Sequence, residues 1–261
     1  MRNGERLIKI FEIINAQKYV TVAELSEQFT VSAMTIRRDL AKLEAQGIIT
    51  TNYGGATLNE GVSAEPSFGI KSGQSQEYKN QIAYEASFLV NDGDSIYIVC
   101  GTTAVELVKY ITGKKITIIT NSWRAISEIQ DFSKVKVLLA PGEYDPISEG
   151  ALSSATISFM QNYVIDKAFI STQGVDLEGG VTVPTDNDAQ VKRAVMKASK
   201  YKILLADHTK FGQTFLAKHG ELKDFNAIIT DDQIDSQIYK QFQEKRCNII
   251  KSTSYLKRKM P

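Results

Sequence analysis

Apolar side chains recur with the period of a helix in three consecutive stretches near the start of the chain. The stretches contain Leu7, Ile10, Phe11 and Ile14, then Val22, Leu25 and Phe29, and finally Ile36, Leu40 and Leu43. Thr21 and Glu24 have the spacing of a capping box, and Ser32 is a favourable N-cap residue. The pattern therefore predicts three helices, of which the last two form a helix-turn-helix.

A β-prone segment follows the third helix. Gly47 is a natural residue just beyond a helix C-terminus, residues 48–53 are mostly Ile, Thr and Tyr, and Gly54-Gly55 predicts a turn. Three helices followed by a β wing predict a winged helix-turn-helix domain over residues 1–57. Residues 58–76 are rich in Gly, Ser, Asn and Glu and predict a linker.

Beyond residue 77, nearly unbroken apolar runs alternate with helical segments. The predicted strands are 95–100, 116–120, 135–139, 168–171, 203–206, 228–230 and 248–251. The predicted helices are 78–90, 104–110, 123–129, 189–200 and 235–243. Strands without polar alternation indicate a sheet that is buried on both faces. Residues 77–261 therefore predict an α/β domain with a mostly parallel sheet.

The third helix carries polar side chains away from its apolar stripe. The candidates for DNA contact there are Ser32, Thr35, Arg37, Arg38 and Lys42. A helix with one packed side and one Arg-bearing side has what a recognition helix needs in the major groove. We expect Thr35, Arg37 and Arg38 to contact bases and phosphates, and Ser32 and Lys42 to position the backbone. The alternative is an ordinary surface helix with solvated arginines.

Composition narrows the class of protein. A hydrophobic share of 43% and a charged share of 23% are typical of a globular protein, and the net charge of +1 places any DNA site in a local patch. The two cysteines lie in apolar runs without metal-binding or redox spacing. We find no signal peptide and no membrane span, which predicts a cytoplasmic protein. We also expect no metal or other cofactor.

Polar residues follow the predicted strands. Ligands bind outside the carboxyl ends of strands in open parallel sheets. Gly101, Thr102 and Thr103 follow the first strand, where a close backbone approach and two hydroxyls suit a phosphate. Asn121 and Ser122 follow the second strand. For residues 101–103 the alternative is a tight turn between strand and helix. For Asn121 and Ser122 it is a simple helix N-cap.

Later segments add further candidates for ligand binding: Gly142, Ser148, Gly174, Lys192, Asp207 and Lys210. For the loop that contains Gly142 and Ser148, turn geometry alone is the alternative. Asp188 and Lys192 have i, i+4 spacing, so a surface ion pair is the alternative there. Asp207 and Lys210 follow a predicted strand. The carboxylate and the ammonium can both point into a shared cleft at the end of that strand.

A family resemblance rests on motifs in both domains. The first set is Thr35-Ile36-Arg37-Arg38-Asp39-Leu40, Leu43-Glu44, Gly47 and Gly54-Gly55-Ala56. It resembles the N-terminal domain of the DeoR family of bacterial sugar-operon regulators. That family typically has an Arg and a His in the wing, where this chain has Thr51 and Tyr53. The resemblance therefore implies that the recognition helix carries more of the DNA contact here.

The second set of motifs spans residues 70–235 in the family's order. It comprises Asp92-Gly93-Asp94, Gly101-Thr102-Thr103, Thr120-Asn121-Ser122, Gly142-Glu143-Tyr144, Asp166-Lys167-Ala168-Phe169, Gly174, Val191-Lys192-Arg193, Asp207 and Lys210-Phe211. It resembles the C-terminal sensor domain of the same family, which implies a fold similar to ribose-5-phosphate isomerase and a sugar-phosphate effector. Lys71 is a candidate for the effector site by resemblance. The family's carboxylates at Val99 and Gln173 are absent, which alters the expected contacts with sugar hydroxyls.

Three functions fit these features. The first, which we favour, is a transcriptional regulator, normally a repressor of a carbohydrate operon, whose affinity for double-stranded operator DNA is changed by a phosphorylated sugar. The second is a sugar-phosphate isomerase with an appended DNA-binding domain, which would need a positioned carboxylate base. The third is an effector-independent DNA-binding protein. We therefore assign no catalytic residue and expect a homodimer or homotetramer.

Overall fold

The computed structural model describes residues 3–59, 66–253 and 255. The chain divides into two compact units, Met1–Gln74 and Ser75–Pro261. No helix among the described residues has the length and apolar character needed to cross a lipid bilayer.

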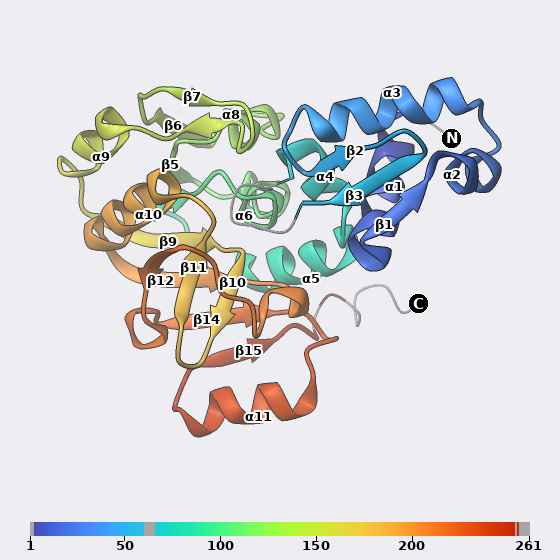
Figure 1. Ribbon diagram of the computed structural model, residues 1–261. Coiled ribbons are helices and arrows are strands. Elements are labelled where there is room, and N and C mark those ends of the chain that lie inside the picture. The colour runs from blue at the N-terminus through green and yellow to red at the C-terminus, as the bar shows by residue number, and fades with distance from the viewer. Residues whose placement is uncertain (1–2, 60–65, 254, 256–261) are drawn as a thin grey trace, which may run out of the picture. The chain divides into compact units, whose positions relative to one another are not determined.

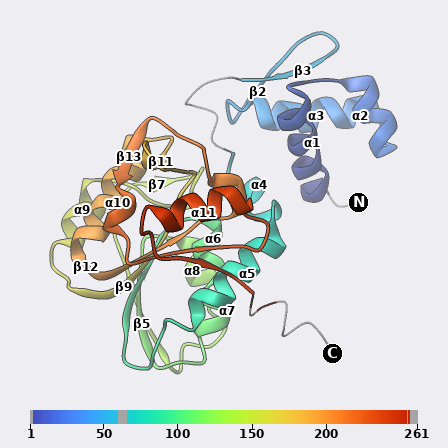
Figure 2. The same cartoon turned by 90° about the horizontal axis from the view of Figure 1, so that it is seen from below.

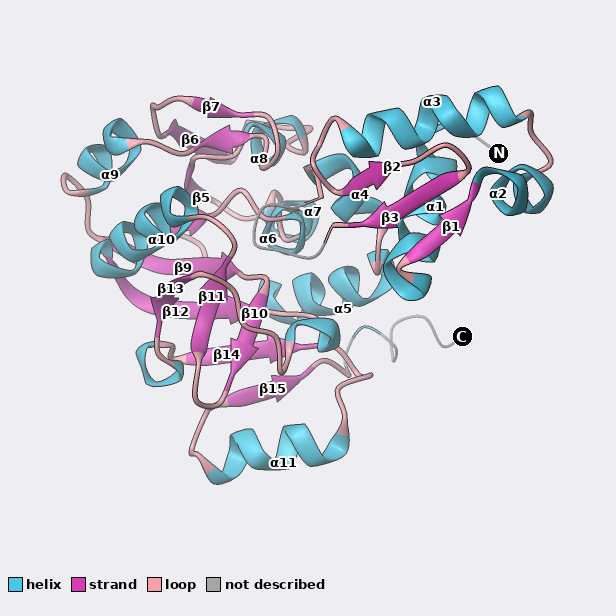
Figure 3. Ribbon diagram, viewed as in Figure 1, coloured by secondary structure: helices cyan, strands magenta, loops and turns pink. Residues whose placement is uncertain are grey.

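The first unit is a winged helix-turn-helix, as predicted. Its helices are α1 (Asn3–Gln17), α2 (Val22–Phe29), α3 (Ala33–Glu44) and α4 (Phe68–Gly73). Its strands β1 (Tyr19–Thr21), β2 (Ile49–Thr51) and β3 (Gly55–Leu58) form an antiparallel sheet in the order β1-β3-β2 (Figure 3). The predicted apolar stripes of the three helices, with Val20, Ile49 and Ala56 of the sheet, pack into one core.

Local capping explains where the helices of the motif begin. Thr21 Oγ1 accepts a hydrogen bond from the Glu24 backbone N–H at 3.1 Å, and the Glu24 carboxylate accepts one from the Thr21 N–H at 2.9 Å. Ser32 Oγ accepts a hydrogen bond from Thr35 N–H at 3.3 Å. Each cap satisfies backbone donors that a helix start leaves unpaired.

The segment 58–76, which the sequence predicted as a linker, contains helix α4. α4 packs against α1, and its Ile70 is buried in the core of the first unit. A Cβ at Gly73 would lie only 2.1 Å from Ile8 Cδ1, so the end of α4 is in close contact with α1. Residues 60–65 of this segment lie outside the described part of the chain.

A buried ion pair joins α1 to α3. Arg6 Nε donates to Asp39 Oδ2 at 2.7 Å, and the Asp39 side chain is only 1% exposed. Lys42 Nζ lies 3.7 Å from the other Asp39 oxygen, but its side chain is 44% exposed. The pair between Arg6 and Asp39 therefore fixes α1 on the back of the predicted recognition helix.

Asp39→Ala is expected to lower the free energy of unfolding of the first unit by about 3–5 kcal/mol, because it leaves the Arg6 charge buried without its carboxylate. Lys42→Ala, the matched control, removes an exposed partner of the same carboxylate and should cost about 0–1 kcal/mol. Urea unfolding of the full chain measures both. Equal losses in the two variants would contradict the structural role of Arg6–Asp39.

The second unit is built on a seven-stranded parallel sheet (Figure 1), which confirms the predicted α/β class. Its strands are β4 (Ser95–Ile98), β5 (Ile116–Thr120), β6 (Val135–Leu139), β9 (Ile165–Ser171), β12 (Ser199–Leu205), β14 (Ala227–Thr230) and β15 (Ile249–Lys251). They lie in the order β15-β14-β12-β9-β4-β5-β6. From β4 the chain adds strands toward β6, and from β9 it adds them toward β15, so the order reverses between β4 and β9. Such a reversal is where ligands bind in open parallel sheets.

Helices connect and cover these strands. Their bounds are α5 (Gln76–Ser87), α6 (Thr102–Glu106), α7 (Val108–Ile111), α8 (Trp123–Ser127), α9 (Ser154–Met160), α10 (Asp186–Ala198) and α11 (Ser236–Glu244), with 3₁₀ turns at His208–Lys210 and Leu222–Asp224. α5 packs against α6, α7 and β14, and α10 packs against β9 and β12. α9 lies beside α10 (Figures 1 and 2).

Two smaller β structures were not predicted from the sequence. β10 (Gly174–Asp176), β11 (Gly180–Val183) and β13 (Ala217–Gly220) form an antiparallel sheet against α10. β7 (Tyr144–Asp145) and β8 (Gly150–Ala151) form a short hairpin, and we refer to residues 143–151 as the flap. Both add elements around the carboxyl ends of the central strands.

Candidate functional site

The predicted DNA-contacting residues lie on one helix of the first unit. Arg37, Arg38 and Lys42 are exposed on α3, while Ile36 and Leu40 of the same helix are buried. The structure therefore brings the predicted cations together on the free side of α3, opposite the core.

The start of α3 presents two hydroxyls. The side-chain oxygens of Ser32 and Thr35 lie 3.0 Å apart, and Ser32 caps the helix. Thr35 is half-buried, so its hydroxyl is held next to the cap. A fixed pair of hydroxyls at a helix start suits contact with a phosphate oxygen.

Thr51, one of the two wing residues that differ from the DeoR pattern, forms the hydrogen bonds that hold the wing. Thr51 donates from its backbone N–H to Glu44 Oε1 at 2.6 Å, and its hydroxyl bonds the same carboxylate at 2.7 Å. These bonds hold the pKa of Glu44 below its ordinary value. Thr51 thus ties β2 to the end of α3, while Tyr53 at the wing tip is fully exposed.

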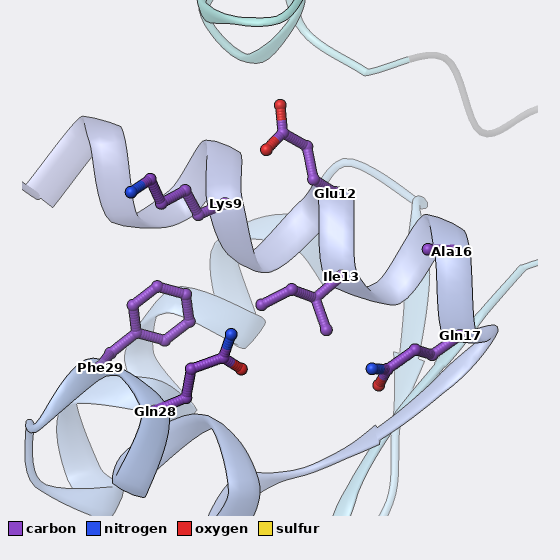
Figure 4. Close-up of a pocket in the computed structure, with 7 residues that line it drawn as sticks. All are labelled: Lys9, Glu12, Ile13, Ala16, Gln17, Gln28 and Phe29. Carbon is purple, nitrogen blue, oxygen red and sulfur yellow. The ribbon is translucent and has the colours of Figure 1, made fainter.

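A groove of about 590 Å³ lies elsewhere on the first unit (Figure 4). It runs between α1 and the end of α2 and is lined by Lys9, Glu12, Ile13, Ala16, Gln17, Gln28 and Phe29. None of the residues predicted for DNA or effector binding lines it, so we assign it no role in either.

In the second unit, the ends of β4 and β9 meet at the switch point. A Cβ at Gly101 would lie 1.6 Å from Ser171 Oγ, so only glycine allows this approach. Thr102 and Thr103 open α6 directly after Gly101 and are 9% and 6% exposed. Leu205 of β12 is in register with Ser171, which brings the end of β12 alongside. We refer to the region formed by residues 101–103, Ser171 and Leu205 at these strand ends as the crevice, after the position at which ligands bind in open parallel sheets.

Asn121 and Ser122 follow β5 but differ in whether their side-chain oxygen already has a hydrogen-bond partner. Ser122 Oγ accepts a hydrogen bond from Ala125 N–H at 3.2 Å and so caps α8. Asn121 Nδ2 donates to Ala151 O at 2.9 Å, whereas Asn121 Oδ1 is buried and has no hydrogen-bond partner among the described residues. Asn121 therefore presents a free acceptor at the end of β5.

Ser148 and Cys100 lie close to Asn121. Ser148 is 7% exposed, and the interaction of its hydroxyl with the Cys100 thiol lowers the pKa of that thiol. Asn121 Nδ2 lies 3.4 Å from Cys100 Sγ. Burial, with the nearby charge of Asp188, raises the pKa of the Cys100 thiol to about 11, so the thiol stays protonated. Buried polar atoms without partners are rare in proteins, which makes Asn121 Oδ1 a candidate contact for a ligand.

Asp188 and Lys192 form a buried ion pair on α10 rather than the surface pair that their spacing allows. Lys192 Nζ donates to Asp188 Oδ2 at 2.6 Å, and the two side chains are 5% and 10% exposed. Asp188 raises and Lys192 lowers the pKa of the Cys100 thiol, so the pair lies within electrostatic range of that thiol. The ammonium of Lys192 can donate three hydrogen bonds, and the contact with Asp188 uses one.

Asp207 follows β12 and is 1% exposed, with Lys210 Nζ 3.7 Å from its Oδ2. Burial raises the pKa of Asp207, but the charges of Lys210 and Lys79 and a hydrogen bond from Thr209 outweigh burial and leave the pKa lowered. Asp207 is therefore a carboxylate.

Lys79, on α5, was not predicted as a site residue although it is 4% exposed and close to Asp207. Lys79 continues the apolar stripe of its helix three residues before Ile82. A lysine in a buried stripe is a signal that sequence analysis can use.

His219 was also not predicted. It is 3% exposed, and burial with the charge of Lys192 holds its pKa well below the ordinary value. Thr172 Oγ1 donates to Thr182 O at 2.7 Å, so it accepts from His219 Nε2 at 3.2 Å. His219 is therefore neutral with a bare Nδ1, which has no partner among the described residues.

Three further predicted effector residues lie on other elements. Gly142 directly precedes the flap and lies close to Ser153 and Thr156, and Gly174 opens β10 against Gln213 and Thr182. Lys71 belongs to α4 of the first unit. No group of three or more His, Cys, Asp or Glu is placed to hold a metal ion within residues 3–59, 66–253 and 255.

Comparison with known proteins matches both units. Residues 6–62 match the DeoR-like helix-turn-helix domain, and residues 74–232 match the DeoR C terminal sensor domain. The uncharacterized HTH-type transcriptional regulator YgbI of Escherichia coli is 33% identical, over 87% of this chain and 89% of its own length. The HTH-type transcriptional repressor GlcR of Bacillus subtilis is 31% identical over 88% and 89%.

A third relative, the glycerol-3-phosphate regulon repressor of Escherichia coli, is 29% identical over 88% of this chain and 92% of its own length. The relatives are transcriptional regulators rather than enzymes. Among solved structures, ribose 5-phosphate isomerase A from Methanocaldococcus jannaschii aligns at 16% identity and a TM-score of 0.40, covering 53% of this chain and 55% of that chain.

Proposed function

Because the chain belongs to the DeoR family of regulators, we propose that it represses a carbohydrate uptake or catabolism operon and that a phosphorylated sugar changes its affinity for operator DNA. The observation that carries the proposal is the cluster at the end of β4. There the buried Lys192 accompanies Asn121 Oδ1, a buried acceptor without a partner among the described residues, and the buried Ser148.

The chemistry of the crevice suits a sugar phosphate. An amide oxygen accepts from a sugar hydroxyl, and a serine hydroxyl both donates and accepts. Lys192 supplies further donors, and Thr102 and Thr103 supply hydroxyls beside Gly101, where the backbone allows close approach. Lys210 and Lys71 remain candidates for neutralising the phosphate.

The DNA-binding step follows from the geometry of α3. A homodimer or homotetramer would place two such helices in successive major grooves. Arg37, Arg38 and Thr35 would contact bases and phosphates, and Ser32 and Lys42 would position the backbone. The effector acts only through a difference in its affinity for the DNA-binding and non-binding states.

A thermal-shift screen of sugar phosphates tests the ligand class. A ligand that binds only the folded protein raises the melting midpoint. We expect glycerol 3-phosphate or a hexose phosphate to raise it and the corresponding unphosphorylated sugar to have no effect. No shift across a broad panel would contradict the proposal and favour an effector-independent DNA-binding protein.

Thr102→Ala combined with Thr103→Ala is expected to abolish the response of operator binding to the effector and to leave DNA binding intact. Both hydroxyls are buried at the crevice, whereas α3 belongs to the other unit. Fluorescence anisotropy with labelled DNA measures both properties. Thr112→Ala, beyond the far end of α7, is the control and should respond like the wild type. A normal response in the double variant would remove these threonines from the site.

A further inference from the structure

The flap packs on the residues that follow β4 and β5. Ala151 N donates to Asn121 O at 2.8 Å, Asn121 Nδ2 returns a bond to Ala151 O, and Trp123 N donates to Glu149 O at 3.1 Å. A Cβ at Gly150 would lie 2.5 Å from Cys100 Cβ. The flap backbone therefore rests directly on the ends of β4 and β5, and it carries Ser148 into the buried cluster.

One ion pair connects the flap to α8. Arg124 Nε donates to Glu149 Oε2, and Arg124 Nη2 donates to Glu149 Oε1 at 3.3 Å. The hydrogen bonds from Arg124 to Glu149 raise the pKa of the guanidinium. The Arg124 side chain is 46% exposed, so an anion in solution can reach it.

Glu149 is held in an unfavourable conformation. Its φ is +52°, in the left-handed region that residues with a Cβ seldom adopt. Its carboxylate meets the guanidinium through two parallel bonds, which is also the way a guanidinium binds a phosphoryl group. The flap thus places an internal anion on an arginine of α8, the helix that follows β5.

We propose that Arg124 is a further phosphate-binding residue of the effector site and that Glu149 occupies it until the effector arrives. The phosphoryl group of the effector displaces the Glu149 carboxylate from Arg124, and the flap loses the ion pair that holds it closed. This inference rests on the proposed function, because it names how that same site recognises its ligand. It adds Arg124, which the sequence did not indicate.

Hydrogen–deuterium exchange of the full chain tests the ion pair without any effector. Glu149→Gln removes the charge of the carboxylate, and the backbone amides of residues 143–151 should exchange roughly tenfold faster, the factor for one lost charge-assisted hydrogen bond. Glu178→Gln is the matched control, since it breaks the exposed pair with Lys245 in the same unit. The flap should exchange equally in Glu178→Gln and wild type. Equal exchange in all three proteins would overturn the proposal.

Binding of inorganic phosphate tests whether a phosphate competes with the Glu149 carboxylate for Arg124. Trp123 is the single tryptophan of the chain and lies next to the flap, so its fluorescence reports binding there. Glu149→Gln should bind phosphate roughly tenfold more tightly than wild type, and Arg124→Ala roughly tenfold more weakly. Unchanged affinity in Glu149→Gln contradicts the proposal even if Arg124→Ala fails to fold.

Operator binding and phosphate binding together distinguish a wrong role for Arg124 from a wrong proposed function. If sugar phosphates control operator binding equally in wild type and Arg124→Ala, the role of Arg124 is wrong and the proposed function stands. If phosphate binding follows the expected order but no sugar phosphate changes operator binding, Arg124 is an anion site and the proposed function is wrong.

Discussion

Lys192→Ala is expected to lower the free energy of unfolding by about 3–5 kcal/mol and to abolish the effector response. The variant leaves the Asp188 carboxylate buried without the ammonium that pairs with it, which is among the most destabilising changes available to a folded chain. Lys197→Ala, an exposed lysine on the same helix, should change the free energy of unfolding by less than about 0.5 kcal/mol. Urea unfolding measures both variants.

A double variant separates stability from ligand binding. Asp188→Leu with Lys192→Met replaces the pair by apolar side chains of similar volume, which is often neutral or stabilising. We expect its free energy of unfolding to approach that of the wild type while the effector response stays absent. A double variant that is stable and responds normally would show that Lys192 only supports the fold.

Arg38→Ala is expected to weaken operator binding by about 1–3 kcal/mol, provided that Arg38 bonds a base edge. The effect should be specific to the operator, and binding of the sugar phosphate should be unchanged, because the crevice belongs to the other unit.

Lys42→Ala supplies the comparison for Arg38→Ala. A phosphate contact weakens binding to all sequences alike and reduces the salt slope by about 1. Anisotropy titrations with operator and random DNA at several salt concentrations distinguish the two behaviours. An equal loss on both DNAs in Arg38→Ala would make Arg38 a phosphate contact.

The elements with strong periodicity were predictable from the sequence. Ile36, Leu40 and Leu43 repeat every three or four residues, and all three are buried in the core. The strands of the parallel sheet were predictable because they are buried on both faces and so lack polar residues. Thr21 and Ser32 are residue types that favour helix N-caps, so they indicated the starts of α2 and α3. Both make the corresponding capping bonds in the structure.

Short elements without periodicity were missed. α4 has six residues, and the strands of the flap have two each, so neither gives a repeating pattern. β10 and β11 form a local hairpin, but β11 and β13 pair across a long insertion that contains α10 and β12. Their pairing depends on tertiary contacts that no local propensity encodes.

The contacts that define the candidate site also could not be predicted from local sequence patterns. The spacing of Asp188 and Lys192 is the same whether the pair is exposed or buried, and only the packing of α10 against the sheet decides which. Arg124 and Glu149 are 25 residues apart, and Arg6 and Asp39 are 33 apart. Their pairing follows from the fold, whereas the strand-end positions of Gly101 and Asn121 follow from the order of strands and helices.

Titration of sugar phosphates into a complex of the full chain with the DNA flanking its gene tests the central claim most directly. We expect one phosphorylated sugar to change operator affinity by about 5- to 150-fold, the range of typical coupling between two sites, and its unphosphorylated form to leave affinity unchanged. The sugar phosphate that raises the melting midpoint should be the one that acts. Operator affinity that stays constant with every sugar phosphate, including one that binds the protein, would contradict the account.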